Sequence, residues 1–153
     1  MSDSLRPLLA SDLDEVAVLE RALFGVSAWS AAMVAEELGA PGRWYVALEV
    51  PGVQDAPQVV GYAGLWFDGD VAQVMTIGVA PHAQGAGRGA RLLEALIEHA
   101  RELGATAVLL EVRVDNDAAL GLYRRRGFEV LGRRRRYYQP EDVDAFTMRL
   151  VLA

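Results

Sequence analysis

Three glycines in five residues, in the motif Gly85-x-Gly87-x-Gly89, stand between two segments with regular hydrophobic patterns. The apolar, β-branched run over 71–79 is typical of a strand, whereas leucines recur at helical spacing after the glycines. Glycines let backbone N–H groups approach an anion closely, and a helix N-terminus offers unpaired donors and the positive end of its dipole. Residues 79–90 are therefore predicted to bind phosphate, and we call them the glycine loop.

Proton-transfer chemistry is indicated by Glu111, a carboxylate within the otherwise apolar run over 106–114. Burial disfavours the charged form of a carboxyl group and raises its pKa, which suits a general base working near neutral pH. The alternative is a structural ion pair with nearby Arg113 or with another arginine. The residues alone leave the base and the ion pair both open.

The composition of the 153 residues removes several classes of chemistry. Cysteine is absent, which excludes disulfides, thiolate zinc sites and a cysteine nucleophile, and lysine is absent, which excludes the P-loop of nucleotide triphosphatases. The formal net charge of −6 argues against direct nucleic-acid binding. No apolar run approaches the roughly 20 residues of a membrane span, and no apolar signal segment opens the chain. We expect a cytoplasmic protein without membrane contact and without a metal.

Hydrophobic periodicity and turn residues predict the elements that position these groups. Strands are expected over 5–9, 44–50, 58–67, 71–79, 106–114, 128–136 and 145–152, and helices over 13–23, 31–38, 87–103 and 117–126. The order β-α-α-β-β-β-α-β-α-β-β requires a mixed, mostly antiparallel seven-stranded sheet with helices on both faces, an α/β class in one domain over 1–153. The helix over 87–103 makes the strands on either side of it parallel.

Local features refine these boundaries. Asn116 is a candidate N-cap, and Gly127 is expected to end the same helix. Met33, Val34 and Leu38 are expected to face inward from the second helix. A polar turn is predicted over 51–57 and a loop over 137–142.

The glycine loop permits two interpretations. The motif Gly85-x-Gly87-x-x-Ala90 fits the fingerprint of Rossmann domains, with Glu111 as the ribose-binding acid. That fingerprint begins directly at a strand end, whereas residues 80–84 intervene here, and the preceding strands form an antiparallel meander. The favoured alternative is a pyrophosphate held by the N–H groups of about residues 85–90.

The loop resembles the acetyl-CoA motif of the GNAT superfamily of N-acetyltransferases. In the pattern V-x-P-x-x-[QR]-x-x-G-x-[GA], the matching positions are Val79, Pro81, Gln84, Gly87 and Gly89. The order of elements along nearly the whole chain is similar as well. The resemblance implies the GNAT fold, acetyl-CoA as cosubstrate and direct transfer of acetyl to an amine.

A closer resemblance is to the RimI-type enzymes, which acetylate the N-terminal alanine of a small-subunit ribosomal protein. The similar segments are 24–30, 110–113, 116, 122–128, 135–138 and 145–148. Two departures concern the acceptor side. Ala28 stands where a proline commonly precedes the tryptophan, and the hairpin around 51–57 is longer than usual.

The resemblance also implies roles for individual residues. Glu111 corresponds to the general base and Tyr123 to the general acid that protonates the departing thiolate, although a plain core aromatic is the alternative for Tyr123. The N–H of Val79 corresponds to the oxyanion donor. The implied cofactor-binding residues are Ile77, Gly78, Val79, Gln84, Gly85, Ala86, Gly87, Arg88, Gly89, Ala90 and Asn116.

Trp29, Tyr137 and Tyr138 are implied to surround the first residues of the acceptor, with loop packing as the alternative. The acidic residues over 141–144 either attract a basic peptide or form a solvated turn. The implied partners are acetyl-CoA and the N-terminal peptide of a protein acceptor, for a monomer or weak dimer.

Two other functions stay open at this stage. One is a GNAT enzyme that acetylates lysine side chains or a small amine. The other is a non-catalytic CoA-binding module.

Overall fold

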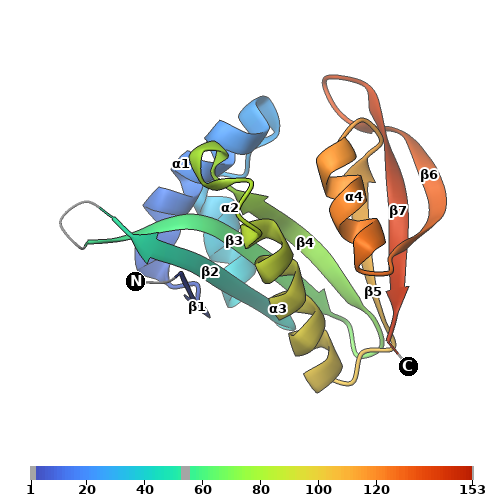
Figure 1. Ribbon diagram of the computed structural model, residues 1–153, viewed down its shortest axis with the longest axis horizontal. Helices are drawn as coiled ribbons and strands as arrows, with labels where there is room; N and C mark the ends of the chain where they lie inside the picture. The colour runs from blue at the N-terminus through green and yellow to red at the C-terminus, as the bar shows by residue number, and fades with distance from the viewer. Residues whose placement is uncertain (1–2, 53–55, 153) are drawn as a thin grey trace. The chain divides into compact units, whose positions relative to one another are not determined.

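The computed structural model describes residues 3–52 and 56–152, and Figure 1 shows their helices and strands along the chain. The strands are β1 Ser4–Pro7, β2 Arg43–Pro51, β3 Pro57–Phe67, β4 Ala72–Val79, β5 Ala107–Arg113, β6 Glu129–Tyr138 and β7 Val143–Val151. The α-helices are α1 Leu13–Phe24, α2 Ala31–Gly39, α3 Arg88–Glu102 and α4 Asp117–Arg125, with short 3₁₀ turns at Ala10–Asp12, Gly25–Ser27 and Pro81–Ala83. The predicted order of strands and α-helices is confirmed.

Hydrogen bonds connect the strands in the order β1-β2-β3-β4-β5-β7-β6, which confirms a mixed seven-stranded sheet. β4 and β5 run parallel through two residue pairs, Ala72↔Val108 and Gln73↔Leu109, as the helix between them predicts. β7 is antiparallel to both β5 and β6 and lies between them. The last strand of the chain therefore inserts into the sheet, which the sequence did not predict.

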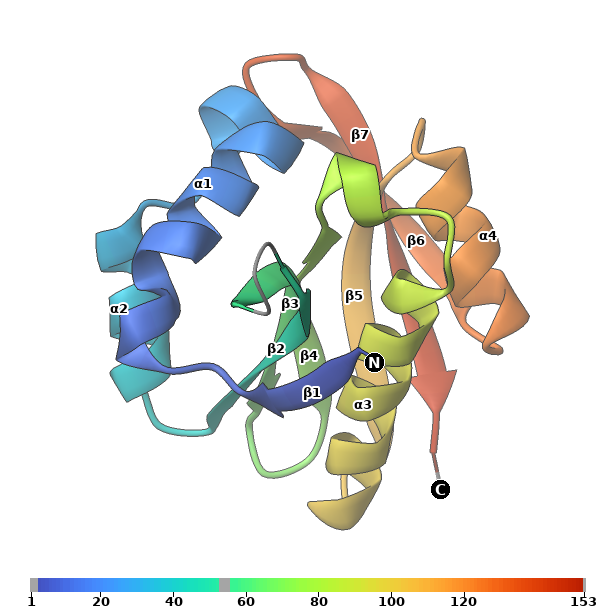
Figure 2. The same ribbon diagram turned by 60° about the vertical axis from the view of Figure 1, so that its left-hand side comes forward.

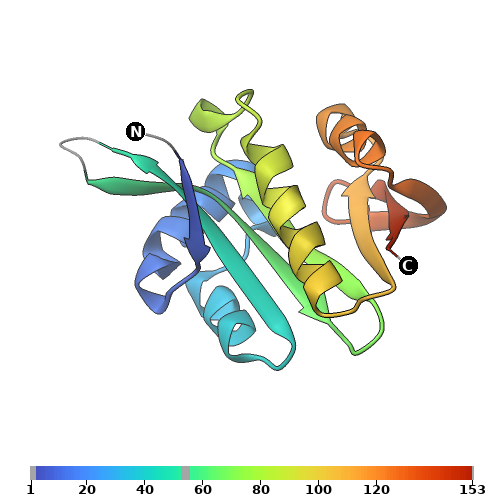
Figure 3. The ribbon, with the colours of Figure 1, turned by 60° about the horizontal axis from the view of Figure 1, so that its bottom comes forward.

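The chain divides into two compact units, which we describe separately. The first unit comprises Met1–Trp66 and Met75–Leu96, and the second comprises Phe67–Val74 and Ile97–Ala153. Within the first unit, α1 and α2 cover one face of the strands, and the first turns of α3 cover the other (Figure 2, Figure 3).

Two glycines mark how closely these helices approach the sheet of the first unit. A Cβ on Gly78 would lie 2.6 Å from the Leu23 side chain of α1, and a Cβ on Gly61 would lie 3.1 Å from Leu92 of α3. Helices on the two faces of this part of the sheet therefore pack directly against the backbone of these glycines. Of the three α2 residues predicted to face inward, Val34 is buried, Leu38 is partly exposed, and the prediction for Met33 is wrong because 47% of it is exposed.

In the second unit, α4 lies alongside β5 and β7 (Figure 1). The Asn116 side chain caps the helix by accepting a hydrogen bond from the Ala119 N–H at 3.1 Å. Gly127, with a φ of 95°, follows the last turn, and the Phe128 N–H donates to the Tyr123 carbonyl. Both predicted ends of this helix are therefore confirmed.

Two loop predictions have different outcomes. Tyr137 and Tyr138 were expected in a loop, but they form the end of β6, whose exposed side chains gave no alternating pattern to extend the strand. The predicted turn over 51–57 lies partly outside the described residues.

Within residues 3–52 and 56–152, no single helix has the length and apolar composition needed to cross a membrane. One pair of helical segments, Ala10–Ser27 and Ala31–Gly39, meets those two criteria only when taken together, and a bend of 109° separates its members.

Candidate active site

The glycine loop is built by short-range hydrogen bonds after the end of β4. The Ala80 N–H donates to the Val60 carbonyl at 2.7 Å, which ties the strand end to β3. The Gln84 side chain then donates to the Val79 carbonyl at 2.9 Å and closes the loop back on the strand. Gly85 and Gly87 have φ values of 85° and 78°, a backbone region that favours glycine. These two glycines are therefore required by the path of the loop.

The backbone donors of the loop are free to bind a ligand. None of the N–H groups from Gly85 to Ala90 donates to another residue of the described chain. They surround the N-terminus of α3, which begins at Arg88, and the loop itself is exposed. The Arg88 guanidinium donates instead to the Ala83 carbonyl and pairs with Asp3 at 2.8 Å. The anion-binding capacity of this segment therefore lies in its backbone rather than in the arginine side chain.

The N–H of Val79 points away from β3. Successive N–H groups of an extended strand point to opposite edges, and the next N–H, that of Ala80, already bonds to β3. By the same alternation, the N–H of Ile77 shares the orientation of Val79. Both donors lie on the strand that leads into the glycine loop.

Trp29 follows the 3₁₀ turn between α1 and α2 and is held by a buried carboxylate that the sequence interpretation missed. Glu20 is 1% exposed and accepts hydrogen bonds from the Trp29 N–H at 2.8 Å and from the Tyr62 hydroxyl at 2.6 Å. Burial raises the pKa of the Glu20 carboxyl, and the hydrogen bonds from Tyr62 and Trp29 oppose the rise. A glutamate on a periodic helix gives no signal that its partners lie on a distant strand and a loop.

Removing this acceptor is expected to destabilise the protein. Glu20→Leu leaves the buried Tyr62 hydroxyl and the Trp29 N–H without their acceptor, so we expect the free energy of unfolding to fall by about 1–3 kcal/mol. Urea unfolding followed by fluorescence measures this change. Weaker binding of an acceptor peptide should accompany it, because the Trp29 segment loses its tether.

Glu20→Gln is the matched control, because its amide offers one acceptor and one donor in the same shape. The pKa of the Glu20 carboxyl is higher in the folded protein than its ordinary value of 4.5 in the unfolded chain. The free energy of unfolding therefore falls as the pH rises from 4.5 through the folded-state pKa. The Gln variant should lack that part of the pH dependence. Equal stability of the Leu and Gln variants at neutral pH would contradict the assignment of Glu20 as the tether.

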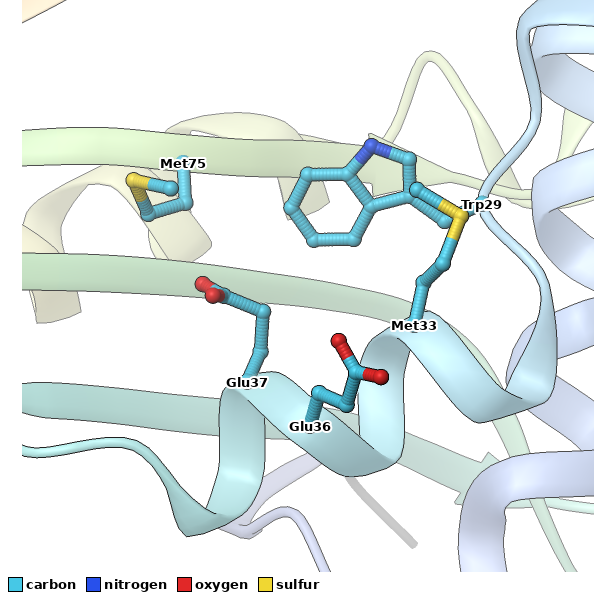
Figure 4. A pocket seen from close by; sticks show the side chains of 5 residues that line it. All are labelled: Trp29, Met33, Glu36, Glu37 and Met75. Atoms are coloured by element: carbon cyan, nitrogen blue, oxygen red, sulfur yellow. The ribbon is translucent and has the colours of Figure 1, made fainter.

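Trp29 also lines a pocket of about 190 Å³ in the first unit. The other lining residues are Met33, Glu36 and Glu37 of α2 and Met75 of β4, and Figure 4 shows their side chains.

In the second unit, Glu111 lies on β5 with 15% of its side chain exposed. Its carboxylate accepts a hydrogen bond from the Thr147 hydroxyl at 2.7 Å, and Arg134 approaches it at 3.4 Å. The predicted partner Arg113 instead pairs with Asp115 and Glu141. An ion pair of Glu111 is therefore present, but with an exposed arginine of β6, and both new partners depend on a strand register that the sequence did not show.

Tyr123 lies on α4 with a buried ring that packs against Phe128, with 5.8 Å between ring centroids. Its hydroxyl has no hydrogen-bond partner among the described residues. Because every fully buried side-chain oxygen there has a partner, this oxygen must remain accessible. Burial, followed by the nearby Tyr138, raises the pKa of the phenol above its ordinary value. Tyr123 therefore has a buried ring and a protonated hydroxyl that remains accessible.

Tyr138 connects these groups electrostatically. Burial, followed by Tyr137 and Glu111, raises the pKa of Tyr138 to about 12. Its ring also packs edge-on against Tyr137 with centroids 5.0 Å apart. The fold of the second unit therefore gathers Glu111, Tyr123 and Tyr138, which lie far apart in the sequence.

The acidic residues that follow β6 are neutralised by arginines. The ion pairs are Arg113–Glu141 at 3.4 Å, Arg136–Asp142 at 3.3 Å and Arg133–Asp144 at 2.6 Å. Of the two alternatives that the sequence left open, these ion pairs agree with a solvated turn. Among the residues described, no group of three or more histidines, cysteines, aspartates or glutamates could hold a metal ion.

The predicted site residues thus fall into two sets. Trp29 and the segment from Ile77 to Ala90 belong to the first unit. Glu111, Asn116, Tyr123, Tyr137 and Tyr138 belong to the second unit. Glu20 and Thr147 are contacts that the sequence interpretation missed, whereas Arg134 is the other arginine that it allowed as a partner of Glu111 without identifying it.

Comparison with known proteins adds family information. The acetyltransferase (GNAT) family matches residues 13–128. The chain is 44% identical over 147 residues to the N-alpha-acetyltransferase RimI of Mycobacterium tuberculosis, covering 93% of this chain and 88% of the relative. The crystal structure of the ribosomal-protein-S18-alanine N-acetyltransferase from Escherichia coli is similar with a TM-score of 0.88 and 28% identity, covering 99% of this chain and 95% of that one. A ribosomal-protein-alanine N-acetyltransferase from Brucella melitensis has a TM-score of 0.78 and 25% identity, covering 97% and 99%.

Proposed function

We propose that this protein acetylates the α-amine of a protein N-terminus with acetyl-CoA. The premise is that the chain belongs to the acetyltransferase (GNAT) family and is an N-acetyltransferase. The N-terminal alanine of a ribosomal protein is the expected acceptor, by similarity to the ribosomal-protein-alanine acetyltransferases. We further propose that both units belong to one acetyltransferase domain over 1–153.

The observation that carries the proposal is a set of six N–H groups, from Gly85 to Ala90 at the start of α3, that donate to no other residue within 3–52 and 56–152. Such a set suits the two phosphates of a pyrophosphate, because the donors are fixed by the loop and helped by the helix dipole. An added Cβ on Gly85 or Gly87 would meet nothing within 4 Å, so the backbone faces open space. Bound acetyl-CoA would supply an activated acyl group as a thioester.

The protein's own groups would then handle charge and protons. The N–H of Val79 would donate to the acyl oxygen as negative charge develops on it. Glu111 would take a proton from the acceptor ammonium, directly or through water, so that the neutral amine can attack the thioester carbonyl, while Thr147 fixes the carboxylate by its hydrogen bond. Tyr123 would give its proton to the leaving sulfur as negative charge develops there, and the raised pKa means that the phenol is protonated at neutral pH. Asn116 would contact CoA in addition to capping α4.

Release of free thiol from acetyl-CoA tests the acceptor class. The acceptors to compare are an alanine-starting peptide, an N-terminally blocked peptide with one lysine, and a set of small amines. Turnover with the alanine peptide alone supports N-terminal acetylation. Turnover with either other class assigns a different acceptor, and CoA binding without any turnover supports a non-catalytic module.

The donor loop is tested by Gly87→Ala. An alanine at a φ of 78° strains the loop backbone by about 1–2 kcal/mol, and the strain is relieved only if the N–H donors move. We therefore expect the Kd for CoA to rise about tenfold or more. Gly87→Trp should abolish detectable binding. Isothermal titration calorimetry with CoA provides the measurement.

Gly104→Ala is the matched control. Gly104 has a φ of 81° and equally open space around an added Cβ, but it follows the other end of α3. Both alanine variants should lose similar stability, whereas CoA affinity should fall only in Gly87→Ala. Equal affinity in the two variants would show that the glycine loop does not hold the cofactor.

A further inference from the structure

The pocket between α2 and β4 has the size of one long side chain. Its volume of about 190 Å³ is below the range of about 300–1,000 Å³ that is typical of small-molecule sites. Figure 4 shows the Trp29 ring and Met75 on one side and the two carboxylates of Glu36 and Glu37 on the other. Such a pocket can accept part of a peptide, but not a whole cofactor.

One of the two carboxylates is already compensated. Glu37 accepts a hydrogen bond from the Tyr45 hydroxyl at 2.6 Å and pairs with Arg43 at 3.4 Å. Glu36 is exposed and makes no hydrogen bond or ion pair with any residue in the described ranges. The pocket therefore carries one negative charge without an internal partner, which matches a single cation.

The remaining lining suits the stem and the face of a long cationic side chain. An aromatic ring attracts a guanidinium or ammonium placed over it. The flexible thioethers of Met33 and Met75 pack against methylene groups of varied shape. Glu20 holds the Trp29 backbone at 2.8 Å, so the loop that carries the ring is fixed beforehand.

We propose that this pocket binds an arginine or lysine side chain within the first residues of the acceptor peptide. The inference rests on the proposed N-terminal acetylation. Met75 and Val79 lie four positions apart on β4, about 13 Å along a strand. An extended acceptor with its α-amine beside Val79 therefore brings its second to fourth residues to the pocket.

Matched peptides that start with alanine test the proposal. In each series one position, the second, third or fourth, carries arginine, lysine, citrulline or norleucine, and the rest of the peptide is kept constant. The kcat/KM for acetylation is measured for each peptide. Citrulline keeps the shape of arginine without its charge. At one of these positions, we expect the cationic residues to be favoured about five- to tenfold over their neutral counterparts.

Glu36→Gln should reduce this preference to within about twofold, because the charge pairing with the cationic residue is removed. Glu36→Lys should favour a glutamate at the same position. Glu98→Gln is the matched control, because it removes the same charge from the exposed surface of α3, where Glu98 pairs with Arg101. It should retain the full preference.

Three results would overturn the proposal. Equal kcat/KM for arginine and citrulline peptides at every position would remove the cation preference. An unchanged preference in Glu36→Gln would place the preference outside this pocket. In both cases acetylation of the peptides would leave the proposed function standing. Absence of turnover with every α-amine peptide would overturn the proposed function and this inference together.

Discussion

Tyr123→Phe is expected to lower kcat about 100-fold or more while the Kd for CoA stays within about twofold of the wild-type value. The reason lies in how the residue is held. Its ring is buried against Phe128, whereas its hydroxyl has no partner among the described residues. Phenylalanine keeps the ring packing and breaks no internal hydrogen bond. Steady-state kinetics, with CoA titrated by calorimetry, provide the measurement.

The same variant separates proton donation from packing. Because no internal hydrogen bond is lost, the free energy of unfolding should change by less than about 0.5 kcal/mol. An acetyl donor with a more acidic thiol needs less help in leaving, so it should restore much of the rate to Tyr123→Phe. If the variant kept full kcat with acetyl-CoA, Tyr123 would be a core aromatic and not an acid.

The pKa of Tyr123 sets the pH range of this role. Burial raises it above the ordinary value of 10.0, so the phenol stays protonated across pH 7–9. A raised pKa moves the loss of the acid form to higher pH, and the contribution of this proton is lost only above that value. Tyr123 should therefore cause no decline of kcat on the alkaline side of this range.

The order of elements could be predicted from the sequence because each element carries its own local pattern. Helical spacing and strand runs gave all eleven strands and α-helices, and Asn116 and Gly127 marked the ends of α4 correctly. These signals lie within a few residues of one another. β6 was harder because nearly all of its residues are exposed, and its last two tyrosines were assigned to a loop.

The contacts of the site depend on register and therefore could not be predicted in the same way. Glu111 faces Thr147 only because β7 pairs with β5 in one register and lies between β5 and β6. Glu20 reaches Tyr62 across 42 positions of sequence. A shift of one residue would turn each strand side chain to the opposite face, and no local pattern distinguishes the two registers on a strand with mixed burial.

Charge compensation was the other property that composition alone could not show. Acidic residues follow β6, and the sequence left open whether they attract a peptide. The structure pairs Asp144 with Arg133 and Asp142 with Arg136, whereas Glu36 on α2 has no partner among the described residues. Three-dimensional pairing, and not the local density of charges, decides which carboxylate can recognise a ligand.

Glu111→Gln is expected to lower kcat/KM about 100-fold or more at pH 6–7, with a smaller loss at pH 9. The wild-type enzyme can bind the acceptor as an ammonium and remove its proton with Glu111. The variant must use the neutral amine already present in solution. For an α-amine with a pKa of about 8, that fraction rises from about 1% at pH 6 to about 90% at pH 9. A pH profile of kcat/KM for an alanine-starting peptide measures the difference.

Arg134→Gln distinguishes the general base from a structural ion pair. Arg134 approaches the carboxylate at 3.4 Å but has 57% of its side chain exposed, so its loss should cost less than about 1 kcal/mol of stability. If Glu111 serves the ion pair, both variants should lose activity equally at every pH. If it is the base, only Glu111→Gln acquires the steep rise with pH, while Thr147 still donates to the oxygen of the new amide. A pH-independent loss in Glu111→Gln would therefore assign the carboxylate to structure, and the proton would need another acceptor.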